Sequence, residues 1–156
     1  MRKLVGVLSA CAVLAGALAM SAVAADNLKI SGTYSYVDTG LCAAPVQVDG
    51  TYNETIHSFY DNAGNEIRVS FTGKVTVTYT NLANGSTYSP NTAGPGTIDL
   101  ATHQTVIRGG NGSYVDSSGR LIATDGRLVL DSHGNVVSLV GHQTDVCAEL
   151  GSSPAP

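Results

Sequence analysis

The chain has 156 residues, with 8 basic and 12 acidic side chains and a formal net charge of −4 at pH 7. The basic residues are few and scattered, so no basic stripe offsets phosphate charge, which argues against nucleic-acid binding and against docking on anionic lipid. The length suits a single domain with its own hydrophobic core.

Residues 1–24 have the pattern of a secretory signal peptide. The second and third residues are basic, Leu4–Met20 is almost wholly apolar and small, and Ala22–Ala24 provides a small-x-small cleavage site. A polar segment without a basic stop follows, which is typical of a removed signal rather than a membrane span. We therefore predict cleavage near Ala24, a secreted mature protein, and no stable membrane insertion after cleavage.

A second type of cleavage site overlaps this segment. Leu8–Cys11 matches the four-residue box at which bacterial lipoproteins are cut and lipidated. A lipoprotein signal has a full apolar core before its cysteine, whereas here Leu4–Ala10 alone would precede Cys11. The sequence therefore favours the ordinary secretory signal over lipidation.

The mature chain is acidic and keeps two cysteines. Loss of Arg2 and Lys3 with the signal leaves six basic against twelve acidic side chains, a net charge of about −6 that we attribute to solubility. Cys42 and Cys147 lie near opposite ends of the mature chain, and two cysteines in an exported protein are expected to form a disulfide. Two free thiols that act in catalysis or metal binding are the alternative.

Three long segments alternate between apolar and polar residues, which is the period-two pattern of half-buried β-strands. These segments are Leu28–Tyr36, Val46–Tyr60 and Glu66–Thr80. Gly32, Gly50 and Gly73 interrupt them near their middles. Glycines at such positions predict bends where a sheet curls.

Turns with Asp first and Gly fourth recur at Asp61–Gly64, Asp116–Gly119 and Asp131–Gly134. They are interpreted as tight hairpin ends, because the Asp side chain accepts backbone N–H groups and Gly takes the left-handed conformation cheaply. Gly109–Ser113 is interpreted as a flexible turn, and Ala148–Pro156 as a loose tail. Shorter strands are expected over Ser86–Ser89, Thr97–Leu100, Gln104–Arg108, Ser113–Val115, Leu121–Ala123, Arg127–Asp131 and Asn135–Gly141.

These patterns predict one all-β domain over 25–147, preceded by the signal peptide and followed by a disordered tail over 148–156. Eight to ten antiparallel strands with one apolar face favour a closed β-barrel, because closure removes exposed strand edges. The mid-strand glycines also suit bending around a tight wall. A β-sandwich is the alternative, and either fold carries one disulfide, Cys42–Cys147.

Signatures of catalysis and metal binding are weak. The four histidines lack the spacing of a metal site, and no Gly-x-Ser-x-Gly elbow occurs. His142 and Asp145 form a two-ligand fragment that an exposed turn explains equally well. We expect no metal and no cofactor.

One acidic residue shares an expected inner face with apolar ones. Glu54 lies between Tyr52 and Ile56 on the apolar face of its strand, and a carboxylate inside a barrel needs partners or a raised pKa. The alternative is that the strand twists near Gly50 and Glu54 faces water. Glu54 is the catalytic candidate, Tyr60 is a further inward aromatic, and the candidate ligand-binding residues are Tyr34, Tyr52, Glu54, Phe71 and Tyr79.

The runs Phe71–Gly85, Ala93–Gly96 and Gly134–Leu150 resemble a group of small secreted actinobacterial proteins without an assigned activity. The resemblance spans most of the mature chain and implies no catalytic motif. Gly32–Tyr34 is similar to the Gly-x-Trp start of lipocalins, but the chain has no Trp, so the barrel architecture alone is comparable. Allene-oxide-cyclase-like and dirigent barrels are similar in size and strand content.

Three functional hypotheses follow. The first is a secreted, non-enzymatic β-barrel that binds a small apolar molecule or a partner at the cell envelope. The second is a small-barrel isomerase- or cyclase-like enzyme that uses Glu54 as its acid–base group. The third is a structural or surface-interaction protein whose Thr/Ser-rich outer face acts without a pocket. The lack of a catalytic set in the sequence favours the first hypothesis.

Overall fold

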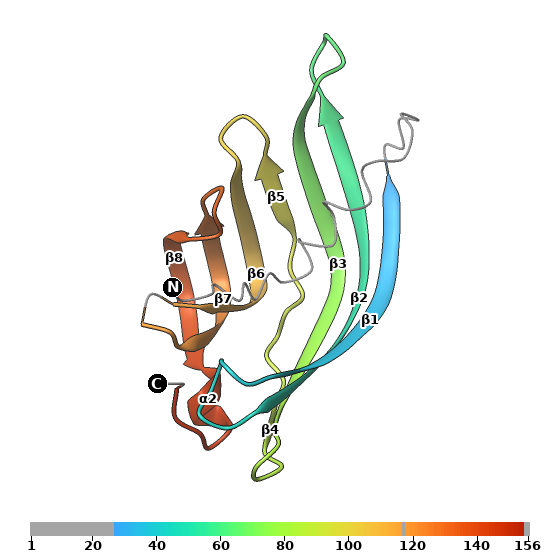
Figure 1. Cartoon of the computed structure of the whole chain (residues 1–156). Coiled ribbons are helices and arrows are strands. Elements are labelled where there is room, and N and C mark those ends of the chain that lie inside the picture. The colour runs from blue at the N-terminus through green and yellow to red at the C-terminus, as the bar shows by residue number, and fades with distance from the viewer. Residues whose placement is uncertain (1–26, 117, 155–156) are drawn as a thin grey trace.

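The computed structural model describes residues 27–116 and 118–154. The predicted signal peptide, its cleavage near Ala24 and the alternative lipidation at Cys11 lie outside these residues. Within them the chain folds as a curved antiparallel sheet with one short helix at its end (Figure 1). Over this part of the chain, no helix has the length and apolar character that crossing a bilayer requires.

Across residues 27–116 and 118–154, eight strands and one single-turn helix follow one another along the chain. They are β1 (Leu28–Asp38), β2 (Val46–Tyr60), β3 (Glu66–Asn81), β4 (Thr87–Tyr88), β5 (Gly96–Asp99), β6 (Gln104–Val115), β7 (Leu121–Leu130), β8 (Val136–Asp145) and α2 (Val146–Glu149).

The eight strands form a single sheet that is not closed. Its order is β1-β2-β3-β5-β6-β7-β8, with β4 paired to β3, and all pairs are antiparallel. β1 and β8 end this order and do not pair with each other, as the open side in Figure 1 shows. The predicted closed barrel is therefore wrong, and so is the two-sheet sandwich. Alternating apolar residues and mid-strand glycines specify a curved sheet with one apolar face, and an open curved sheet meets both conditions.

The three long strands confirm the predicted alternation. β2 pairs with β1 along the whole of β1 and with β3 along nearly the whole of β3. On β3, Phe71, Val77 and Tyr79 are buried, whereas Lys74 and Thr76 between them are exposed. These three strands therefore form a wall with one apolar face and one polar face.

The three turns with Asp first and Gly fourth are hairpin ends, as predicted. In the β2–β3 turn, one Asp61 carboxylate oxygen accepts hydrogen bonds from the backbone N–H of Ala63 at 2.8 Å and of Asn65 at 2.9 Å. Gly64 has a φ of 84°, which is the left-handed conformation that glycine adopts cheaply. The turns between β6 and β7 and between β7 and β8 repeat these contacts around Asp116 and Asp131.

β6 is one long strand where the sequence predicts two short ones. The expected flexible turn at Gly109–Ser113 lies inside Gln104–Val115, with a bulge between Gly110 and Gly112. Gly109 and Gly112 have φ values of 83° and 78°, so the strand bends there without leaving its ladder to β7. The predicted turn is wrong because a glycine-rich bulge and a glycine-rich turn look alike in sequence.

The hydrophobic core lies at one end of the sheet, around the disulfide. Cys42 in the β1–β2 loop is bonded to Cys147 in α2, with their Cα atoms 5.6 Å apart, which confirms the predicted pair. The fully buried side chains of this end come from the β1–β2 loop, β2, β3, β7, α2 and the residue after it. The cluster consists of Leu41, Cys42, Val46, Val48, Val77, Tyr79, Leu121, Ala123, Val146, Cys147 and Leu150.

The segment after β8 folds into this core. Its Leu150 side chain is fully buried, and the Leu150 carbonyl accepts hydrogen bonds from the Nδ2 atoms of Asn81 at 3.0 Å and Asn84 at 3.1 Å. The predicted disordered tail over 148–156 is therefore wrong for the part that the structure describes. One buried leucine among small and polar residues leaves no periodic pattern from which its burial follows.

Candidate functional site

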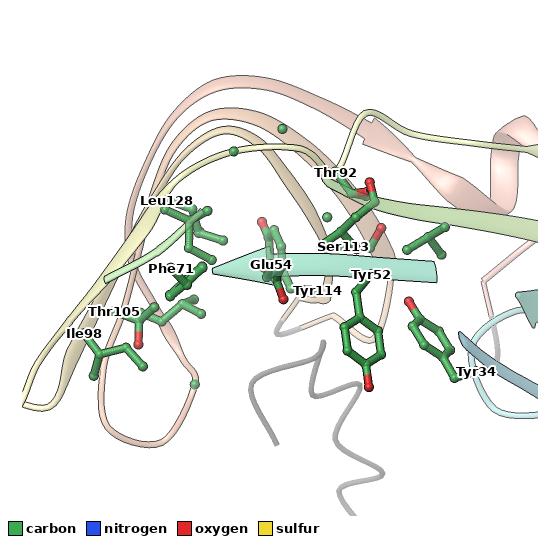
Figure 2. Close-up of a pocket in the computed structure, with 18 of the residues that line it drawn as sticks. Tyr34, Tyr52, Glu54, Phe71, Thr92, Ile98, Thr105, Ser113, Tyr114 and Leu128 are labelled. Carbon is green, nitrogen blue, oxygen red and sulfur yellow. The ribbon is translucent and has the colours of Figure 1, made fainter. Parts of the chain in front are cut away.

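An open groove of about 720 Å³ lies along the concave face of the sheet (Figure 2). The five candidate ligand-binding residues all line it, although they come from three different strands. Tyr60, the further aromatic expected to point inward, lies exposed at the end of β2 and is not part of the lining. The five lining candidates are Tyr34, Tyr52, Glu54, Phe71 and Tyr79.

The alternation of side chains along β2 places Glu54 in the groove. Val48, Tyr52, Glu54 and Ile56 are separated by even numbers of residues on β2, so they share one face of the sheet. All four line the groove. The alternative in which a twist near Gly50 turns Glu54 outward is not observed.

The neighbouring strand approaches β2 closely beside Glu54, at a glycine. Glu54 pairs with Gly73 of β3, which has no side chain to cover the carboxyl group. A Cβ atom added at Gly73 would meet the backbone of Asn53 and the Cα atom of Glu54. Gly73 therefore permits the close approach of β3 to β2 at this point, and it adds no side chain next to the Glu54 carboxyl group.

Two tyrosine rings lie over glycines of the adjacent strand. Tyr34 pairs with Gly50, and Tyr52 pairs with Gly32. A Cβ atom at Gly32 would stand 2.6 Å from the Tyr52 hydroxyl oxygen, and one at Gly50 would overlap the Tyr34 ring. These glycines thus give the rings room to lie flat on the wall, in addition to the bending that the sequence predicts.

The Glu54 carboxyl group has no hydrogen bond and no ion pair with any residue in the described part of the chain. Figure 2 shows it between Phe71 on one side and Tyr52 on the other. Burial among these groups raises the pKa of Glu54 above its ordinary value of 4.5. The side chain is half-buried, so water still reaches it.

The groove lining described by the structure contains a second carboxylate and no lysine or arginine. This carboxylate belongs to Asp131 in the β7–β8 turn, where it accepts hydrogen bonds from the backbone N–H of His133 and Asn135 and from Asn135 Nδ2. The hydrogen bond from the Asn135 side chain contributes most to the lowered pKa of Asp131. The Asp131 carboxylate is therefore occupied by hydrogen bonds within its turn, whereas the Glu54 carboxyl group has no hydrogen bond with the described residues.

Tyr79 lies at the packed end of the groove. Desolvation by burial raises its pKa to about 12, so its phenol stays protonated at neutral pH. The Ser113 hydroxyl faces Tyr79 and partly offsets this shift, yet its geometry does not make a full hydrogen bond. Ser113 Oγ is thereby a buried polar atom without a partner in the described residues.

The sequence patterns do not predict several of the residues that line the groove. Ser113 falls in the segment interpreted as a flexible turn, and Thr92 lies between strands, where its hydroxyl donates a hydrogen bond to the Val75 carbonyl at 2.5 Å. Loop positions of this kind have no alternation that would indicate an inward side chain. Further lining residues on β5, β6 and β7 and in the β5–β6 turn include Ile98, Thr105, Ile107, Tyr114, Leu128 and His103.

The histidines do not gather into a metal site. In residues 27–116 and 118–154, no three His, Cys, Asp or Glu side chains are grouped so that they could hold an ion. His142 of the two-ligand fragment lies exposed on β8. The lining of the groove thus contains two carboxyl groups, an imidazole, hydroxyl groups and apolar side chains.

Comparison with known proteins adds no relative to this picture. No protein-family model matches the chain, and no curated protein or solved structure matches it. The resemblance to small secreted actinobacterial proteins stays a prediction.

Proposed function

We propose that this is a secreted binding protein that holds a small apolar molecule in the groove on the concave face of its sheet. The groove itself is the observation that carries the proposal. Its volume of about 720 Å³ falls within the roughly 300–1,000 Å³ of ligand pockets in general, and such pockets combine an apolar lining with a few polar groups.

The division of the molecule into two ends supports this proposal. At the disulfide end, the side chains pack against one another until they are fully buried. Toward the hairpin turns, half-buried apolar side chains such as Ile98 and Ile107 line the groove beside the more buried Phe71 and Leu128. Apolar surface on a concave face is stabilised when a ligand removes it from water.

Blocking the groove tests the proposal. Val75 lines the groove, and Thr72 lies on the same strand with its side chain exposed outside it. We expect Val75→Trp to weaken the binding of N-phenyl-1-naphthylamine, an uncharged apolar fluorophore, at least tenfold, while Thr72→Trp leaves it unchanged. Fluorescence titration measures both affinities, and circular dichroism checks that both variants are folded. Equal binding by the two variants would contradict the proposal.

A retained natural ligand gives an independent check. Native mass spectrometry of protein taken from the culture medium of its host is expected to show a mass above that of the bare chain. Absence of the protein from the medium would contradict the proposed secretion. A bare chain would favour an interaction surface or an envelope partner over a ligand.

The second candidate function is that of an acid–base enzyme. The raised pKa of an unpartnered carboxyl group in a groove favours it, because acid–base catalysts have such groups. The same mass spectra discriminate the two functions. A bound compound that is recovered chemically unchanged after prolonged incubation supports binding, whereas its conversion supports catalysis.

A further inference from the structure

Glu54 is a carboxyl group in an apolar groove with no partner from the described protein. Its neighbours on the same face of β2 are Tyr52 and Ile56, and its position on β3 is taken by Gly73. Carboxyl groups in such surroundings are costly unless a hydrogen-bond donor or a positive charge reaches them. The described residues supply neither, so in the groove the carboxyl group meets water unless a ligand brings a donor or a positive charge.

We propose that the groove binds an apolar molecule that carries a protonated amine, with Glu54 as the counter-ion of the amine. This inference rests on the proposed function, since it requires the groove to be a ligand site. It goes further by assigning the charge of the ligand and the residue that recognises it.

The charges around the groove discriminate against the opposite class of amphiphile. The lining in the described part of the chain has two carboxylates, Glu54 and Asp131, one imidazole, that of His103, and no lysine or arginine. A fatty acid would bring a third negative charge into a partly desolvated space, where like charges repel more strongly than in water. An ammonium group instead donates charge-assisted hydrogen bonds to a carboxylate.

The two halves of the groove also suit a molecule with distinct ends. In Figure 2, Phe71, Ile98 and Leu128 gather on one side of Glu54, while Tyr34 and Tyr52 lie on the other side. An apolar chain therefore lies against the first group, and its amine meets Glu54 at the middle of the groove. The hydroxyl-bearing side accepts any further polar part of the ligand.

Three probes of equal chain length test the charge preference. Dodecylamine, dodecanol and dodecanoate are titrated below their micelle concentrations as competitors of N-phenyl-1-naphthylamine on the mature, disulfide-bonded protein. We expect dodecylamine to bind at least tenfold more tightly than either of the others. The variant Glu54→Gln should lower the affinity for dodecylamine about tenfold and leave that for dodecanol unchanged.

An acidic residue outside the groove provides the matched control. Asp49 is exposed on the same strand, so Asp49→Asn removes one negative charge without touching the groove lining. This variant should keep the full preference for the amine. If Asp49→Asn loses the preference as much as Glu54→Gln does, overall acidity explains the binding and the inference fails.

The remaining outcomes separate the two proposals. Equal affinity of the wild-type protein for dodecylamine and dodecanol overturns the role of Glu54 but leaves an apolar ligand site in place. Binding of none of the three probes overturns both this inference and the proposed function.

Discussion

Glu54 occupies surroundings that disfavour its charged form. Neither a hydrogen bond nor an ion pair from the described residues compensates the burial that raises its pKa. A carboxyl group with a raised native pKa binds its proton more tightly in the folded state than in the unfolded state. Ionisation at neutral pH therefore lowers the stability of the fold.

This linkage predicts a pH-dependent effect of Glu54→Gln on stability. Well below the ordinary pKa of 4.5, the group is protonated in both states and the substitution changes little. As the pH rises through the pKa of the folded state, the wild-type protein loses stability that the variant keeps. At pH 7 the variant should therefore be more stable than the wild-type protein, with solvent at the half-buried side chain keeping the difference small.

Urea unfolding of wild type and Glu54→Gln at pH 3 and pH 7 measures this difference. An equal difference at both pH values would show that ionisation of Glu54 is not its cause.

At the scale of elements, the segment from β8 into α2 packs into the hydrophobic core at the disulfide end of the sheet. Asp145 caps α2 by accepting a hydrogen bond from the Ala148 backbone N–H at 3.1 Å. Leu150, just beyond the helix, is fully buried and is held by the amides of Asn81 and Asn84. Because a helix of one turn is not stable on its own, α2 is stabilised by tertiary burial rather than by helix propensity.

Because this segment is part of the core, a single substitution in it should have a large effect on the free energy of unfolding. Leu150→Ala should lower the free energy of unfolding by about 2–5 kcal/mol, because it leaves a cavity in a fully packed cluster. Glu149→Ala, one residue earlier and exposed, should change it by no more than about 0.5 kcal/mol. Urea titration of both variants measures the contrast, and similar small losses in both would mean that this segment does not pack in solution.

At the scale of the whole molecule, a covalent bond joins regions that strand pairing leaves unjoined. β1 and β8 do not pair. The Cys42–Cys147 bond instead ties the loop after β1 to the helix after β8, over a sequence separation of 105 residues. Constraint of so long a loop reduces the entropy of the unfolded chain, which stabilises the folded one.

Loss of this bond should be costly. Chain-entropy arguments give about 4.7 kcal/mol for a loop of this size, and removal of native disulfides from small domains commonly costs about 2–5 kcal/mol. We expect the double variant Cys42→Ser/Cys147→Ser to lose stability in this range in urea unfolding, and reductant to have the same effect on the wild-type protein. Thiol titration of the unfolded, unreduced protein should find no free sulfhydryl. Two free thiols, or an unchanged urea midpoint, would contradict this role.

Local patterns in the sequence were sufficient for the strands of the long wall and for much of the site. Period-two alternation placed β2 and β3 correctly and put Tyr52, Glu54, Phe71 and Tyr79 on one face. The Asp-first turns and the cysteine pair also followed from residue chemistry. These features depend on neighbours close along the chain, or on two residues with one available partner.

The tertiary structure alone decided whether the sheet closes, how β6 bends and where the chain end packs. Alternation states which face of a strand is apolar, but it carries no information on whether β1 and β8 meet. The side chains of Thr92, Ser113 and Leu150 acquire their surroundings from strands distant in sequence. Their positions depend on how the whole sheet curves. That curvature results from contacts between residues distant in sequence, which a local sequence pattern does not indicate.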